Sequence, residues 1–255
     1  MSADPYLAFV GFYDVWTRDV EGDVDFYVRR AIAVDGPVVE LGAGTGRIAI
    51  PTAQAGKDVI AVDLSEAMLA EARKRAADAG VADRITFVEH DMRDFVASDP
   101  VELVTIPYRS FLHMATTEDQ LACLASVNRS LALGCRLILN MFVPDPAFVA
   151  GQDRRRNLHG EFTDEKGRRC ELWVTPEYEV TTQNITIRAT VEAYDEGRLL
   201  ETSESALHVR MVYRYEMEHL LARLGFEVEA LYGDFDERSL TEECREMIWV
   251  ARKPR

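Results

Sequence analysis

Residues 37–46 read Pro-Val-Val-Glu-Leu-Gly-Ala-Gly-Thr-Gly, and this stretch decides the fold that we expect for the chain. Val38, Val39 and Leu41 form a short apolar run of the kind found in buried strands, and the run ends at alternating glycines. Glycine lacks a Cβ atom, so the backbone can turn sharply there and offer its N–H groups to a nucleoside or a charged chain. The stretch therefore predicts a strand followed by a ligand-binding turn, although a tight turn in any α/β protein has a similar pattern.

The spacing of the glycines separates two classes of nucleotide site. A dinucleotide fingerprint requires Gly-x-Gly-x-x-Gly, but Arg47 stands at the third position and the glycine comes one place early, at Gly46. Counted from Glu40, the pattern is Glu-x-Gly-x-Gly-x-Gly. It resembles the first motif of the class I S-adenosylmethionine (AdoMet)-dependent methyltransferases, in which the acid reaches the amino-acid end of the cofactor. The resemblance thus implies cofactor contacts from Glu40, Gly42, Ala43, Gly44 and Gly46.

A second apolar run, Val59-Ile60-Ala61-Val62, ends in Asp63, which lies 21 positions after Gly42. This is close to the interval of about 20 residues at which an acid meets a ribose in nucleotide-binding folds. Asp63 could instead cap the helix that follows, but Ser65 is better placed as the N-cap. We therefore predict that Asp63 binds the ribose, with Leu64 and Met68 beside the cofactor.

Two further strand ends carry candidate site residues. The strand predicted at 84–89 is followed by His90-Asp91-Met92; in the same family an acid here receives the adenine amino group and an apolar neighbour packs on the ring. The strand predicted at 101–107 continues as Ile106-Pro107-Tyr108-Arg109-Ser110-Phe111-Leu112-His113. Enzymes that methylate bases or amides usually carry an Asn- or Asp-Pro-Pro-Tyr-like motif at this point, so the departure argues against base methylation. Asp91, Met92 and Ile106 are thus predicted cofactor contacts.

His113 is the candidate catalytic residue. The segment resembles the small-molecule branch of the family, in which a His beyond this strand faces the transferred methyl group. An imidazole with a pKa near 6.5 can accept the proton that a nucleophile loses at neutral pH. The alternative is that His113 only positions the substrate or caps the adjoining helix. Tyr108 and Arg109 are predicted to line the substrate pocket.

Residues 5–33 have helical periodicity and are predicted to form a lid over the glycine turn. Tyr13 is assigned to the cofactor and Trp16 to the substrate, because aromatic side chains could shield either molecule. The alternative is that Trp16 simply packs on a sheet.

The order of the elements predicts an α/β fold. We expect a Rossmann-like seven-stranded sheet in the order 3-2-1-4-5-7-6, with the last strand antiparallel and helices on both faces, as the resemblance implies. Period-two patterning over 159–211 predicts an inserted antiparallel sheet of three or four strands. The predicted domains are a helical lid (1–36), an AdoMet-binding core (37–143 and 212–255) and an insertion (144–211) that covers substrate or forms a dimer contact.

Composition narrows the partners and the compartment. The chain has 255 residues and a net charge of −15, which argues against nucleic acid, because sequence-independent affinity for phosphate backbones comes from clustered Lys and Arg. The four cysteines show no Cys-x-x-Cys pair, and no signal peptide or membrane span is evident. We expect a cytoplasmic protein with no metal site and no membrane partner, and the choice between a monomer and a homodimer stays open.

The leading hypothesis is transfer of the AdoMet methyl group to a nitrogen or oxygen of a small-molecule metabolite. One competing interpretation is a Rossmann oxidoreductase of the NAD type, which would use the same strand and acid but is weakened by Arg47. The other is an AdoMet-binding protein without catalysis. The acceptor itself is not given by the sequence.

Overall fold

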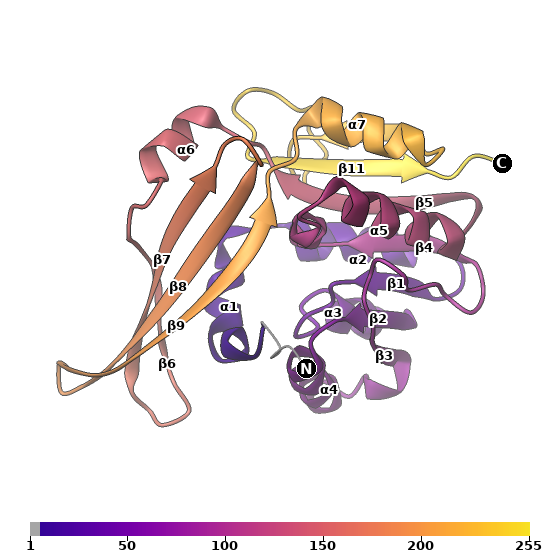
Figure 1. Ribbon diagram of the computed structural model, residues 1–255. Coiled ribbons are helices and arrows are strands. Elements are labelled where there is room, and N and C mark those ends of the chain that lie inside the picture. Colours follow the sequence, from indigo (N-terminus) through magenta and orange to yellow (C-terminus); the bar gives the residue numbers. More distant parts are fainter. Residues whose placement is uncertain (1–5) are drawn as a thin grey trace. The chain divides into compact units, whose positions relative to one another are not determined.

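The computed structural model describes residues 6–255 and divides into two compact units, coloured along the chain in Figure 1. The core unit comprises residues 20–143 and 212–255, and the insert unit comprises residues 6–19 and 144–211. The predicted N-terminal segment 1–36 is therefore divided at residue 19, and α2 (Asp23–Ile32) belongs to the core unit.

The core unit is built on a seven-stranded sheet in the order β10-β11-β5-β4-β1-β2-β3. The strands are β1 (Val38–Leu41), β2 (Val59–Asp63), β3 (Ile85–Glu89), β4 (Val101–Ile106), β5 (Leu131–Phe142), β10 (Glu227–Tyr232) and β11 (Glu246–Arg252). Strand β11 runs antiparallel to both of its neighbours, whereas β1 to β5 pair in parallel. Numbered within this sheet, the order is 3-2-1-4-5-7-6 with an antiparallel last strand, so the predicted fold class is confirmed.

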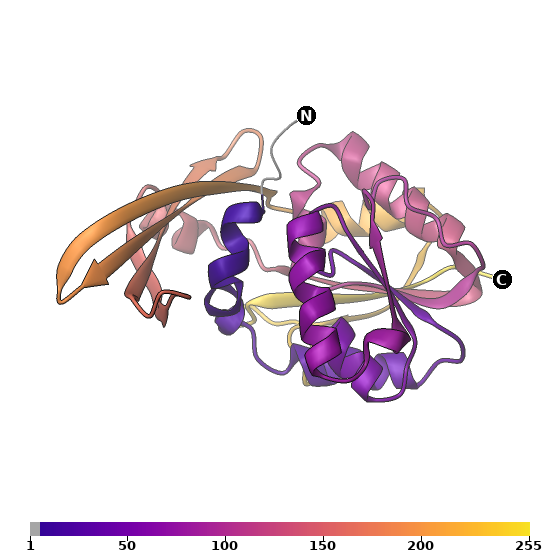
Figure 2. The same cartoon turned by 90° about the horizontal axis from the view of Figure 1, so that it is seen from below.

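Helices cover both faces of this sheet. Helices α5 (Thr117–Ser130) and α7 (Arg214–Arg223) lie on one face and α2 lies on the other (Figures 1 and 2). Helices α3 (Ala49–Gln54) and α4 (Glu66–Asp78) connect β1 to β2 and β2 to β3. Under α2, Phe26 and Tyr27 are buried against side chains of β4, β5 and β11. All four residues of β1 are buried, as expected for a central parallel strand covered on both faces.

Two predicted helices differ from the structure. The described part of 5–33 is not one helix: it forms 3₁₀ turns at Leu7–Phe12 and Thr17–Asp19, the short α1 (Tyr13–Trp16), and α2. Gly22, with a φ of 80°, interrupts the chain before α2. The amphipathic pattern of residues 117–133 predicts a helix that reaches Leu133, but α5 ends at Ser130, and β5 begins at once with Leu131. An irregularity in the pairing of β4 with β5 absorbs the following residues, including Gly134 at a φ of 81°.

The insert unit contains a four-stranded antiparallel sheet in the order β6-β7-β8-β9. The strands are β6 (Asn157–Thr163), β7 (Arg169–Glu179), β8 (Asn184–Asp195) and β9 (Arg198–Arg210), preceded by α6 (Pro146–Gln152), which the sequence did not predict. The turn between β8 and β9 has positive φ at Glu196 and Gly197, the geometry of a tight hairpin. Within this unit α1 packs on β6, where a Cβ atom at Gly160 would lie 2.6 Å from Val15. The inserted antiparallel sheet is therefore confirmed.

Candidate functional site

The glycine turn after β1 lies directly against the loop after β4. Gly42, Gly44 and Gly46 have positive φ values of 72°, 55° and 83°. A Cβ atom on Gly42 would lie 2.7 Å from both Cβ and Oγ of Ser110, and 3.5 Å from Cε of Met92. No side chain fits at this position without displacing a neighbour, because real Cβ atoms do not approach other atoms so closely. The loops that follow β1, β3 and β4 therefore meet at Gly42.

Asp63, at the end of β2, closes the turn from the side. Its Oδ2 accepts a hydrogen bond from the backbone N–H of Gly44 (2.7 Å), and its Oδ1 accepts one from Ser65 (2.9 Å). The side chain of Ser65 caps α4 by accepting from the N–H of Met68 at 3.2 Å, as predicted. The N-cap of α4 is therefore Ser65, and Asp63 lies half-buried at the edge where a ribose is expected.

Glu40 is the most perturbed acid of the turn. It lies in β1, is 3 % exposed, and burial raises its pKa from 4.5 to about 8. The charge of Arg47 opposes this shift, and the carboxylate of Asp63 adds to it. In the unliganded protein Glu40 is therefore mostly protonated at neutral pH, so a cation placed beside it would lower its pKa and expel the proton.

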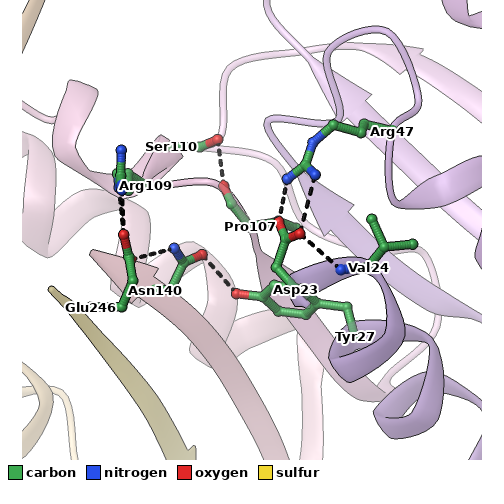
Figure 3. A network of polar contacts seen from close by, with 9 residues as sticks. All are labelled: Asp23, Val24, Tyr27, Arg47, Pro107, Arg109, Ser110, Asn140 and Glu246. Carbon is green, nitrogen blue, oxygen red and sulfur yellow. Dashed lines mark hydrogen bonds and ion pairs between the residues drawn. The ribbon is translucent and has the colours of Figure 1, made fainter. Parts of the chain in front are cut away.

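Arg47, which replaces the fingerprint glycine, forms a buried ion pair with Asp23 at the start of α2 (Figure 3). Nη1 lies 3.1 Å from Oδ1, and Nη2 contacts Oδ2. Asp23 is 1 % exposed and the Arg47 side chain 20 %, so the carboxylate is shielded from solvent. This contact joins α2 to the glycine turn. The sequence reasoning missed Asp23, for which the only signal was an acid immediately before the apolar positions of α2.

Asp91 and Met92 follow β3, as predicted. Both carboxylate oxygens of Asp91 accept hydrogen bonds from Arg93, which holds the pKa of Asp91 below its usual value. Arg93 also reaches Asp119 of α5, with Nη1 at 2.7 Å from Oδ1. A ligand amino group at Asp91 would share this carboxylate with Arg93, and the assignment to adenine stays a prediction.

The loop after β4 is strained where it leaves the strand. Ile106 is fully buried, and Tyr108 and Arg109 then adopt left-handed backbone conformations with φ values of 49° and 63°. Each such residue costs roughly 1–3 kcal/mol and persists only where the surroundings hold it, which is typical of functional sites. A 3₁₀ turn, Ser110–His113, follows and leaves His113 half-buried. Arg109, predicted as a substrate contact, pairs with Glu246 of β11.

The remaining predicted site residues differ in burial and in the compact unit to which they belong. Ala43 and Met68 are buried (4 % and 2 % exposed), whereas Leu64 is 53 % exposed. Tyr13 and Trp16 belong to the insert unit, where Trp16 packs edge-on against Phe9 and beside His159. The alternative considered for Trp16, packing on a sheet, thus describes its contacts, and its role toward substrate stays a prediction.

Neither a group of metal ligands nor a membrane-spanning helix is found in residues 6–255. No three His, Cys, Asp or Glu side chains of this part of the chain are grouped to hold a metal ion. None of the helices in the same range is long and apolar enough to cross a membrane.

The turn fits a nucleoside with a charged tail on structural grounds. It combines glycine backbone without Cβ atoms, the half-buried carboxylate of Asp63 beside Gly44, and the buried acid Glu40. The hydroxyl of Thr45 in the same turn is also fully buried and has no hydrogen-bond partner in residues 6–255. Such a group usually has a partner in a complete site.

Replacing Gly42 with Ala should abolish binding of S-adenosylhomocysteine and lower the melting temperature, because the new Cβ would meet Ser110. Gly36→Ala is the matched control: Gly36 also has a positive φ (62°), but nothing lies within 4 Å of its Cβ position. Calorimetric titration of both variants should show binding only for Gly36→Ala. Equal affinity in the two would contradict the close approach of the loops.

Comparison with known proteins agrees with this geometry. Residues 38–134 match a family model described as a methyltransferase domain. The chain is 28 % identical over 218 residues to the cypemycin N-terminal methyltransferase of a Streptomyces species. The aligned region covers 85 % of this chain and 82 % of that protein.

Two solved structures share the fold over nearly the whole chain. The CcbJ methyltransferase of Streptomyces caelestis superposes with a TM-score of 0.82 at 21 % identity, covering 99 % of this chain and 97 % of the other. CalS10 of Micromonospora echinaspora, an amino pentose methyltransferase solved with bound AdoMet, gives 0.72 at 20 % identity and 96 % coverage of both chains. The cofactor predicted from the sequence is thus the one bound in a structure of this fold. The predicted resemblance is confirmed: residues 38–134 match the model of a methyltransferase domain, and the chain shares its fold with solved AdoMet-dependent methyltransferases.

Proposed function

We propose that this protein transfers the methyl group of AdoMet to a nitrogen or oxygen of a small molecule, with an amine as the favoured acceptor. The observation that carries the proposal is the meeting of three loops at Gly42, with Asp63 beside them and His113 on the turn after β4. The names of two similar proteins, an N-terminal methyltransferase and an amino pentose methyltransferase, support an amine.

Different residues of the chain bind different parts of the cofactor. Glu40 takes the amino-acid end, Asp63 the ribose, and Asp91 with Met92 the adenine, while Ala43, Leu64, Met68 and Ile106 supply apolar contacts. When bound, AdoMet provides an electrophilic methyl group on a sulfonium. The protein has to orient the acceptor in line with that group and to keep the acceptor's lone pair unprotonated.

We assign His113 as the base that accepts the proton lost by the methyl acceptor. An amine loses a proton as it gains the methyl group, and a half-buried imidazole can accept it near neutral pH. Tyr108 is the adjoining acceptor contact. Arg109 pairs with Glu246, and its predicted contact with the substrate stays a prediction. Three assignments stay predictions from the sequence: Tyr13 to the cofactor, Trp16 to the substrate, and the inserted sheet to a substrate cover or a dimer contact.

The competing oxidoreductase is disfavoured by what Arg47 does in the fold. Its guanidinium pairs with Asp23 and lies 5.0 Å from the ring centre of Tyr108, at the position where a dinucleotide fold needs a glycine for close helix packing.

The cofactor assignment predicts that S-adenosylhomocysteine binds with saturation and that NADH does not. Asp63→Asn should weaken S-adenosylhomocysteine by about tenfold or more, because a hydrogen bond to a charged group is lost. Asp58→Asn, at the exposed start of the same strand, should leave affinity unchanged. Isothermal titration measures all three proteins, and NADH binding in place of S-adenosylhomocysteine would favour the oxidoreductase.

Replacing His113 with Ala should lower kcat by roughly 100-fold, within the range typical of general base catalysis, and should leave the affinity for S-adenosylhomocysteine unchanged. The wild-type kcat should rise with pH through the ionisation of an imidazole, and this limb should vanish in the variant. A methyl-transfer assay against a panel of small amines and alcohols measures both effects. An unchanged pH profile in His113→Ala would assign the proton to another group.

Affinity for the cofactor should rise with pH through Glu40. The pKa of this acid is about 8 in the unliganded fold, and a bound ammonium would lower it, so binding releases a proton below pH 8. Affinity should therefore increase by up to tenfold per unit between about pH 6 and pH 8. The stability of the unliganded protein should change in the opposite sense, being highest below the unfolded pKa and falling as the pH rises through 8.

Titrations with S-adenosylhomocysteine in two buffers of different ionisation enthalpy measure the released proton. Glu40→Gln should release none through this residue and should show a nearly flat dependence on pH. The same proton release in the variant would place the titrating group elsewhere.

A further inference from the structure

Separate groups of polar contacts lie beside the strained turn after β4 (Figure 3). On one side, the hydroxyl of Tyr27 donates to Oδ1 of Asn140 at 2.9 Å, and Nδ2 of Asn140 donates to Oε2 of Glu246 at 2.9 Å. Glu246 then accepts from Nε of Arg109 at 2.9 Å through its other oxygen, which Nη2 also contacts. The path thus runs from α2, across β5 and β11, to the loop after β4.

A second group of polar contacts also begins on α2. Asp23 lies four residues before Tyr27 on α2 and holds Arg47 of the glycine turn. Both guanidinium groups, those of Arg47 and Arg109, face the ring of Tyr108, with Cζ atoms 5.0 Å and 5.7 Å from its centre. Cation–π contacts of this kind strengthen when they are shielded from water.

The side chains that lead from α2 to Arg109 are buried, and their burial explains why they hold Arg109 in place. Asn140 and Tyr27 are fully buried and Glu246 is 6 % exposed, so the carboxylate has little access to water and relies on its protein partners. Burial also raises the pKa of Tyr27 well above its usual value, which keeps its hydroxyl a donor. Glu246 of β11, held by Asn140 of β5, therefore sets the position of the Arg109 side chain.

The turn that Arg109 begins carries the proposed catalytic residue. Tyr108 and Arg109 are consecutive left-handed residues, and non-glycine side chains keep this conformation only when other contacts hold it. The turn is closed by the N–H groups of Ser110, Leu112 and Met114, which donate to the carbonyls of Pro107, Arg109 and Phe111. Release of Arg109 would relax this backbone and move His113.

We propose that Glu246, acting through Arg109, is a positioning residue for methyl transfer: it holds the left-handed turn at Tyr108 and Arg109 and so sets the position of His113. Its kinetic consequence rests on the proposed function, whereas its effect on the turn does not. Glu246 accepts from both Asn140 and Arg109, so an amide in its place would turn an NH₂ group toward one of these donors.

The experiment compares Glu246→Gln, Arg109→Gln and the double variant with Glu227→Gln as control. Glu227 forms the same kind of pair with Arg252 in the same sheet, but its side chain is 56 % exposed and far from these contacts in the pairing register. Hydrogen exchange of the amides of Ser110, Leu112 and Met114, without ligand, should accelerate by about tenfold or more in both single variants. The double variant should exchange no faster than either single one, because the two residues act as one unit, and Glu227→Gln should match the wild type.

Kinetics separates positioning from simple loss of stability. In Glu246→Gln, kcat should fall by about tenfold or more, while the affinity for S-adenosylhomocysteine and the KM for AdoMet change by less than about twofold. Arg109→Lys retains the charge but cannot make both contacts to one carboxylate oxygen, and it provides the same comparison if Glu246→Gln does not fold.

Unchanged exchange at the three amides, or additive effects in the double variant, would overturn the inference. A uniform loss of cofactor affinity together with kcat would also overturn it, since that pattern describes general destabilisation. If the wild type methylates no acceptor while the exchange results hold, the proposed function fails and the role of Glu246 in the turn stands.

Discussion

The close approach of the Gly42 backbone to the side chain of Ser110 is the constraint on which the site depends. Strands β1 and β4 are parallel neighbours, with Val39 opposite Val104, so both open at the same edge of the sheet. The sheet order reverses between these strands, because the chain continues to β2 and β3 on one side and to β5 on the other. Such a switch point is where α/β sheets place their ligands. The two loops can meet there only because position 42 has no Cβ atom.

The charged groups around this edge contribute geometry more than stability. Removing Asp23 and Glu246 from water is costly, and the attraction of their arginine partners roughly compensates that cost. Exposed pairs elsewhere, such as Arg136 with Glu229, are worth about 0–1 kcal/mol and fix little. The buried pairs differ because an arginine that leaves its carboxylate strands a charge in the interior. They therefore restrain Arg47 and Arg109 to one arrangement, which a ligand-binding edge requires.

The predictions failed where local pattern competed with pairing between distant segments. The periodicity of α5 continues past Ser130, yet Leu131 pairs with Val101 of β4, and the sheet ends the helix early. Residues 5–33 have helical spacing throughout, but the chain changes compact unit near Asp19, and Gly22 breaks the run. In both places tertiary contacts override a propensity worth only tenths of a kcal/mol per residue. The strands before the candidate sites were predicted within a few residues, because their apolar runs end at a glycine, at an acid or, after β4, at Pro107.

The sequence by itself determined the glycine turn, the acid 21 positions later, the strand order implied by the resemblance, and the inserted antiparallel sheet. These features are local, since they depend on backbone freedom, side-chain periodicity and short spacing. Only the tertiary structure showed which distant charged residues pair inside the fold. Arg109, a predicted substrate contact, pairs with Glu246, 137 positions away. A pairing across that separation leaves no periodic trace in the chain, because each partner alone resembles an ordinary surface charge.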